Sequence, residues 1–207
     1  ARNYVRMAVL DGKLYAVGGR EADGATSNLL ERYDLATNAW EEVAPMATPH
    51  EGHAVAVLDG KLYAVGGYND DDDGGIASVE RYDPAANAWE AVAPMATERS
   101  DHGVAVLDGK LYAVGGYSND GVVLSSVERY DPALDAWEAV APMATALYNH
   151  ALAVLDGKLY AVGGVNGHIN SVERYDLATN AWEAVAPMGE ERSRPGVAAL
   201  DGKLYAV

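Results

Sequence analysis

Cysteine and phenylalanine are both absent from this 207-residue sequence, and basic residues are scarce. Without cysteine the chain has no disulfides, no thiolate metal ligands and no cysteine nucleophile, and its redox compartment cannot be read. Fifteen Lys and Arg stand against 31 Asp and Glu, which gives a formal net charge of -16. The basic patch that binds a phosphate backbone is therefore missing, and nucleic acid is not an expected partner.

Long apolar runs are missing as well. No window reaches the roughly 18 apolar residues of a membrane span, and the N-terminal residues lack the basic-then-apolar order of a signal peptide. We therefore expect a soluble protein without a membrane partner, and the sequence assigns no compartment. The lack of phenylalanine beside 13 Tyr and 4 Trp is unusual for a natural chain and points to a designed or consensus-derived sequence.

One twelve-residue string, AVLDGKLYAVGG, occurs unchanged at residues 8–19, 56–67, 105–116 and 153–164. A shorter copy, AALDGKLYAV, occupies residues 198–207. Such a period identifies a repeat architecture. We expect a single domain over residues 1–207, with repeats of approximately 1–48, 49–97, 98–145 and 146–190 and a half repeat at 191–207.

Each full repeat predicts four antiparallel strands. In the second repeat, HAVAVL and KLYAV flank Asp59-Gly60, the strongest signal for a two-residue hairpin. Gly66-Gly67 is expected to break the second strand, SVERYD forms the third strand before Pro84, and AWEAVAPM forms the fourth. Apolar side chains on both faces of the first strand require neighbouring sheets on both sides, which a propeller supplies.

The double glycine after KLYAV, the following ERYD, and Tyr and Trp seven residues apart resemble the Kelch repeat. The resemblance implies an all-β, Kelch-type β-propeller with four full four-stranded blades plus a two-stranded half blade. It also implies that the first strand of each blade lines the channel. The half blade would leave the KLYAV edge at 203–207 unpaired, so self-association through this edge is expected.

Function is expected where the repeats differ, in two sets of loops at one rim of the ring. One set precedes each first strand and the other follows each double glycine. The resemblance implies that these positions recognise a partner, and Tyr and Arg side chains suit that role. The predicted ligand-binding residues are Asn3, Tyr4, Arg20, Glu51, Tyr68, Ser100, Asp101, Tyr117, Tyr148, Asn149, Ser193 and Arg194. Arg2, Arg192 and Arg194 are expected to attract an anionic group to one side of this rim.

His53, His102 and His150 share one repeat position, which invites a metal site, but packing between blades is the stronger interpretation. Asp70 to Asp73 lack the alternating spacing of a calcium loop. The charged residues of ERYD and DGK are interpreted as edge protection and solvation. No catalytic residue, metal site or cofactor is assigned.

The sequence thus favours a non-enzymatic scaffold that binds a peptide, protein or small ligand on its variable loops. Two alternatives stay open. One is a natural or engineered enzyme or metal site that uses His50, Glu51, Asp101 and His150. The other is a structural design that tests the folding and assembly of an incomplete propeller.

Overall fold

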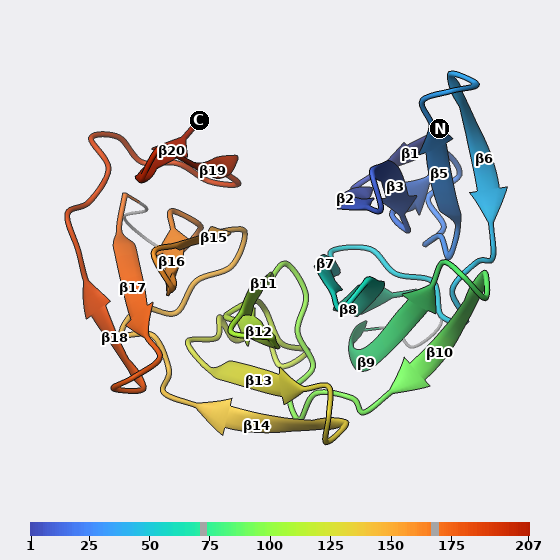
Figure 1. Ribbon diagram of the computed structural model, residues 1–207. Helices are drawn as coiled ribbons and strands as arrows, with labels where there is room; N and C mark the ends of the chain where they lie inside the picture. Colours follow the sequence, from blue (N-terminus) through green and yellow to red (C-terminus); the bar gives the residue numbers. More distant parts are fainter. Residues whose placement is uncertain (71–73, 167–169) are drawn as a thin grey trace. The chain divides into compact units, whose positions relative to one another are not determined.

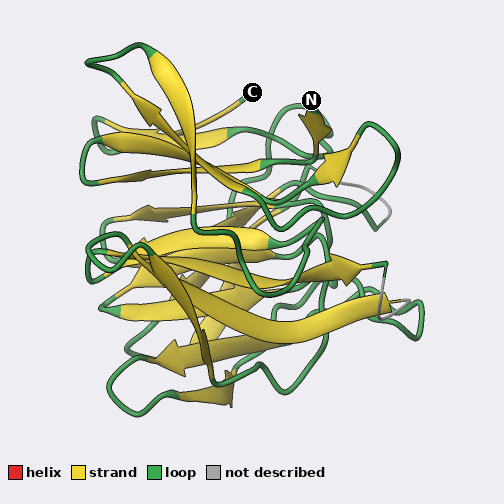
Figure 2. Cartoon of the chain, turned by 90° about the vertical axis from the view of Figure 1, so that its right-hand side faces the viewer, coloured by secondary structure: helices red, strands yellow, loops and turns green. Residues whose placement is uncertain are grey.

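A computed structural model describes residues 1–70, 74–166 and 170–207, which form strands joined by loops and turns (Figure 2). Within these ranges no helix could cross a membrane. The all-β prediction is confirmed. The chain divides into two compact units, Ala1–Ser100 and Asp101–Val207, and each is described by itself.

The first unit contains two four-stranded antiparallel sheets and a short two-stranded ladder (Figure 1). The ladder pairs β1 (Arg2–Asn3) with β4 (Arg20–Glu21). In each sheet the strands lie in chain order. The sheets consist of β2 (Arg6–Leu10), β3 (Lys13–Val17), β5 (Leu30–Asp34) and β6 (Ala39–Val43), then β7 (Ala54–Leu58), β8 (Lys61–Asn69), β9 (Gly74–Asp83) and β10 (Ala88–Val92).

The second unit contains two further four-stranded sheets and one sheet of two strands. Its strands are β11 (Gly103–Leu107), β12 (Lys110–Val114), β13 (Val127–Asp131), β14 (Ala136–Val140), β15 (Ala151–Leu155), β16 (Lys158–Val162), β17 (Val172–Asp176), β18 (Ala181–Ala184), β19 (Val197–Leu200) and β20 (Lys203–Ala206). The described residues thus form four complete blade-like sheets and the predicted half blade.

The hairpin turns match their sequence signal. Asp59 has φ 50° and Gly60 has φ 70°, the pair of positive values that a tight two-residue hairpin requires. The expected break at the double glycine is confirmed in three repeats, where β3, β12 and β16 end at Val17, Val114 and Val162. It is wrong in the second repeat, because β8 continues through Gly66-Gly67 to Asn69. Gly67 pairs with Ile76 across a register shift, so a bulge replaces the expected break. The fourth strands are shorter than expected and end at Val92 and Val140.

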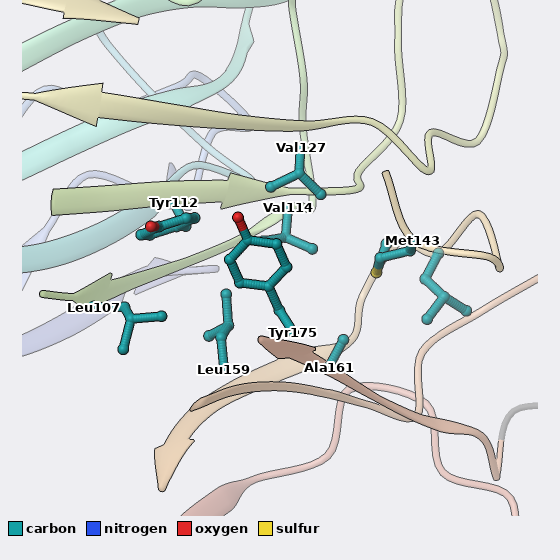
Figure 3. Close-up of a cluster of buried hydrophobic side chains, with 9 residues drawn as sticks. Leu107, Tyr112, Val114, Val127, Met143, Leu159, Ala161 and Tyr175 are labelled. Carbon is teal, nitrogen blue, oxygen red and sulfur yellow. The ribbon is translucent and has the colours of Figure 1, made fainter. Parts of the chain in front are cut away.

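Within each unit, the first strands of consecutive sheets lie beside one another, and the sheets pack face to face. In the second unit, the ring of Tyr175 on β17 lies 5.7 Å from that of Tyr112 on β12 (Figure 3). In the first unit, Tyr82 and Tyr15 make the equivalent contact at 6.0 Å. The second full sheet of each unit therefore contributes its third-strand tyrosine to the core of the preceding sheet.

The glutamate of ERYD departs from the sequence interpretation. Glu80 is only 3% exposed, and its carboxylate accepts hydrogen bonds from the backbone N–H groups of Ala47 and Thr48. Burial raises the pKa of Glu80, but these bonds and His50 outweigh it, so the pKa lies below its usual value. Glu173 binds the preceding repeat in the same way through Ala144 and Thr145. This repeated charge ties the sheets together and is not a solvated edge residue.

The double glycines mark the closest backbone approach between repeats. The N–H of Gly19 donates to the carbonyl oxygen of His50 at 2.8 Å. A Cβ atom on the neighbouring Gly18 would lie 2.7 Å from that oxygen and 2.8 Å from the His53 ring. Because the obstructing atom is backbone, the contact leaves no space for a side chain.

Gly18 and the hairpin glycine Gly12 form a matched pair for testing this constraint. Both have positive φ, at 55° and 71°, but a Cβ at Gly12 meets nothing within 4 Å. We expect Gly12→Ala to reduce the free energy of unfolding by about 1 kcal/mol through backbone strain alone. Gly18→Ala should cost at least about 2 kcal/mol more because of the clash. Urea denaturation measures both, and equal losses would contradict the role of close approach.

Candidate functional site

Every repeat holds one left-handed residue seven positions before its hairpin aspartate. We call this the rim position. It is occupied in chain order by Tyr4, Gly52, Asp101, Asn149 and Arg194, with φ values from 51° to 58°. The five residues are chemically different while the backbone conformation is constant. The repeat therefore imposes the conformation, and the side chain is left free to vary.

In the second unit, the rim positions of successive repeats are joined by backbone hydrogen bonds. The N–H of Asn149 donates to the carbonyl of Asp101 at 2.8 Å, and the N–H of Arg194 donates to that of Asn149 at 2.9 Å. The guanidinium Nε of Arg194 also donates to Asn149 Oδ1 at 3.0 Å. This ladder holds three of the predicted ligand-binding residues beside one another.

The two sets of variable loops meet, as the sequence predicts. In the first repeat Asn3 pairs with Arg20. Glu51 bridges Tyr68 in the second repeat, and Tyr148 bridges Val165 in the fourth. Each pairing joins the loop before a first strand to the loop after the double glycine, so both loops lie at the same end of the sheet.

In the first unit, the predicted site residues are largely engaged with one another. Arg20 donates to both carboxylate oxygens of Glu51, at 2.5 and 2.6 Å, and also approaches Asp70 at 3.1 Å. The hydrogen bonds that Arg20 donates to Glu51 raise the pKa of Arg20 further above its already high value. Tyr4 is 55% exposed. The Arg20–Glu51 pair therefore acts first as a clamp between neighbouring loops.

The second unit places aromatic rings at the same two repeat positions. Tyr117 corresponds to Arg20 and Tyr148 to Glu51, and the two rings lie 5.7 Å apart at a tilt of 51°. Tyr117 is 40% exposed. Ser193 and Arg194 are also exposed, whereas Ser100, which belongs to the first unit, is half-buried. The second unit thus presents an aromatic pair, the Asn149 amide and an exposed guanidinium.

The expected contribution of Arg2 to the anion-attracting side is wrong. Its side chain is 7% exposed and forms a salt bridge with Glu31. Its guanidinium also donates to the carbonyls of Gly18 and Leu29 at 2.6 and 2.9 Å. His50 occupies the same position in the next repeat and contacts the Gly66 carbonyl at 2.7 Å. This position serves the buried backbone, so the positive charge assigned to Arg2 does not reach the rim.

The three histidines at one repeat position are buried, as the packing interpretation predicts. His53, His102 and His150 are 0%, 4% and 8% exposed. The His53 ring lies against Gly18 of the preceding repeat, and the His150 ring lies against Gly115. The rings of His53 and His150 therefore fill space between sheets.

The alternative catalytic or metal set receives no geometric support from the described residues. His50 is fully buried, and its Nε2 lies 3.5 Å from Glu80, while Glu51 binds Arg20. Across residues 1–70, 74–166 and 170–207 no group of three His, Asp or Glu side chains is placed to hold a metal ion. The weak calcium candidate includes Asp71 to Asp73, which lie outside the described residues.

His150 gives a pH prediction. Burial lowers its pKa from 6.5 to about 4, so the folded state keeps the ring neutral. The unfolded chain binds more protons between these values, and stability must fall as the pH drops below about 6.5. Val5 occupies the same repeat position, which makes His150→Val a natural replacement.

We expect wild type to lose about 2 kcal/mol more than His150→Val between pH 7 and pH 5. Urea denaturation at both pH values measures this difference. Parallel losses in the two proteins would contradict the lowered pKa.

The comparisons with known proteins agree with this geometry. The family model described as the KLHDC2/KLHL20/DRC7 Kelch-repeats domain matches residues 5–207. A solved structure, described as the structure of YjhT, matches with a TM-score of 0.86 at 16% identity, covering all of this chain and 76% of that one. At this identity it shows the fold alone. The curated proteins contain no match. The chain belongs to the Kelch-repeat domain family.

Proposed function

We propose that this chain is a non-enzymatic binding scaffold that recognises a peptide or protein through its variable loops. The observation that carries the proposal is the constant left-handed rim position, where the side chain differs in every repeat. Kelch domains are usually protein-binding scaffolds. A rigid backbone with exchangeable side chains is the arrangement that such a function requires.

The second unit has the stronger binding chemistry. Tyr117 and Tyr148 offer a large aromatic surface at low entropic cost, and Asn149 adds a polar contact. The exposed Arg194 can pair with a carboxylate. A peptide with an apolar or aromatic side chain near an acidic one matches this surface best. In the first unit, the mutual pairing of Arg20 and Glu51 leaves Tyr4 as the more available contact.

Small ligands on the same loops belong to this proposal as a second class of partner. The near-identical repeats and the absence of phenylalanine support a consensus-derived origin. Self-association through residues 191–207 remains a prediction from the sequence.

A displayed library of random peptides tests the proposal. Peptides selected on the wild-type chain should bind the triple variant Tyr4→Ala, Tyr148→Ala and Arg194→Ala at least about tenfold more weakly, because its aromatic and charged contacts are gone. Titration of each labelled peptide measures the change. The free energy of unfolding of the triple variant should stay within about 0.5 kcal/mol of the wild-type value, since these side chains lie outside the core.

The matched control is Leu35→Ala with Leu134→Ala. Both leucines are strongly exposed, at 75% and 74%, and both lie in turns after the third strand. Their removal should leave binding unchanged. Selected peptides that bind the triple variant as well as wild type, or a library that yields no binder, would contradict the proposal.

A further inference from the structure

Two tyrosine rings from different repeats meet at the rim of the second unit. The ring of Tyr117, after β12, lies 5.7 Å from that of Tyr148, before β15, at a tilt of 51°. The main chain holds the two loops together, because the N–H of Gly116 donates to the carbonyl of Leu147 at 2.8 Å. The N–H of Leu147 in turn donates to the carbonyl of Leu124 at 3.1 Å. Backbone packing therefore sets the contact between the rings, and the tyrosine side chains are not needed to create it.

The same two repeat positions carry other side chains elsewhere in the chain. Their occupants are Arg20 with Glu51, Tyr68 with Ser100, and Val165 with Ser193. Arg20 and Glu51 form a salt bridge across the equivalent contact in the first unit. Two phenols thus come together at one such contact, where they have a chemistry that the other pairs lack.

Two further tyrosine contacts, each within one unit, allow a comparison. They are Tyr112 with Tyr175 at 5.7 Å and Tyr15 with Tyr82 at 6.0 Å. These four rings are at most 1% exposed and belong to the cores, whereas Tyr117 is 40% exposed and Tyr148 is half-buried. The three contacts have similar lengths, so access to solvent is what distinguishes the rim pair.

Exposure affects both steps of an oxidation that would join two phenols. Loss of an electron from a phenol releases its proton, and burial opposes this by raising the pKa of Tyr82 and of Tyr175. Coupling then requires the two rings to turn toward one another. Exposed side chains change rotamer within nanoseconds, but rings in a close-packed core are held in place. Only the rim pair among these three contacts meets both requirements.

We propose that Tyr117 and Tyr148 form an oxidative modification site, at which a haem peroxidase with hydrogen peroxide joins them as dityrosine. The oxidised peroxidase takes one electron and one proton from each phenol. The two phenoxyl radicals carry spin on the ring carbons beside the oxygen, and a carbon–carbon bond forms between one Cε atom of each ring. Each of these carbons then gives up its proton, and each oxygen regains one. The two electrons and two protons removed reduce hydrogen peroxide to two molecules of water.

The new bond would tie the loop after β12 to the loop before β15, and so the third repeat to the fourth. It forms within one chain and needs no bound ligand. The modification therefore goes beyond the proposed binding function and can be tested without a partner.

Treatment of the dilute 207-residue chain with a haem peroxidase and hydrogen peroxide tests the proposal. The main product should be a monomer that has lost two hydrogen atoms and shows dityrosine fluorescence. Tandem mass spectrometry of its tryptic peptides should place the bond between Tyr117 and Tyr148. The monomeric cross-link yield should fall at least about tenfold in Tyr117→Phe and in Tyr148→Phe, because neighbouring groups react far faster than separate molecules.

Tyr4→Phe is the matched control, because Tyr4 is even more exposed than Tyr117, at 55%. Its loss should leave the yield of monomeric cross-link within about twofold of wild type, since it lies outside the reacting pair. Each phenylalanine keeps the aromatic ring and removes only the hydroxyl group, and circular dichroism checks the fold of each variant.

Three results would overturn the proposal. One is a wild-type chain that yields no monomeric cross-link, or mainly cross-linked dimers at every dilution. Another is a bond that maps to a core pair such as Tyr112 and Tyr175. The third is an undiminished yield in a folded Tyr117→Phe or Tyr148→Phe variant. If either variant does not fold, the position of the bond in the wild-type product still decides the question.

Discussion

The close backbone contact at the double glycines is the constraint on which the arrangement of successive repeats depends. In four successive-repeat contacts within the units, the second glycine donates its N–H to the carbonyl of His50, Arg99, Leu147 or Arg192 in the next repeat. A side chain on Gly18, Gly115 or Gly163, the first glycine at three of these contacts, would strike the same carbonyl. The contact limits how far apart adjacent sheets can lie. The tyrosine rings that meet between the sheets are accordingly at similar centroid distances, 6.0 Å for Tyr15 and Tyr82 and 5.7 Å for Tyr112 and Tyr175.

Buried polar groups complete the junctions. Backbone N–H groups after the fourth strands β6 and β14 would be costly to leave unpaired, and the third-strand glutamate of the next repeat accepts them. Arg2 and His50, at one repeat position, both contact the carbonyl of a first double-glycine residue and a third-strand glutamate. Arg2 and His50 thus make equivalent contacts to a buried carbonyl and a glutamate carboxylate, which is why either residue at this position leaves the sheets in place.

Features with local causes were predictable from the sequence. Asp-Gly defines the hairpin through two positive φ values, and the spacing of valine and tyrosine defines the strands. Features that depend on contacts with the neighbouring repeat were not predictable from the sequence. The charged pattern of ERYD does not reveal that Glu80 lies under the loop of another repeat, although the recurrence of this glutamate was a usable signal. Likewise, Arg2 looks like a free surface cation until Gly18, Leu29 and Glu31 are placed around it.

The loop side chains can change without loss of the fold because the main chain, and not these side chains, sets the loop conformation. The main chain fixes the rim position through its left-handed conformation and, in the second unit, through N–H to carbonyl bonds from one repeat to the next. The loop side chains beside the rim position then need to be compatible only with one another. Arg20 with Glu51 and Tyr117 with Tyr148 occupy equivalent positions, yet one pair is ionic and the other aromatic. Because neither pair belongs to the buried core clusters, the side-chain chemistry of the loops can differ between the two units while the stacking within each unit stays the same.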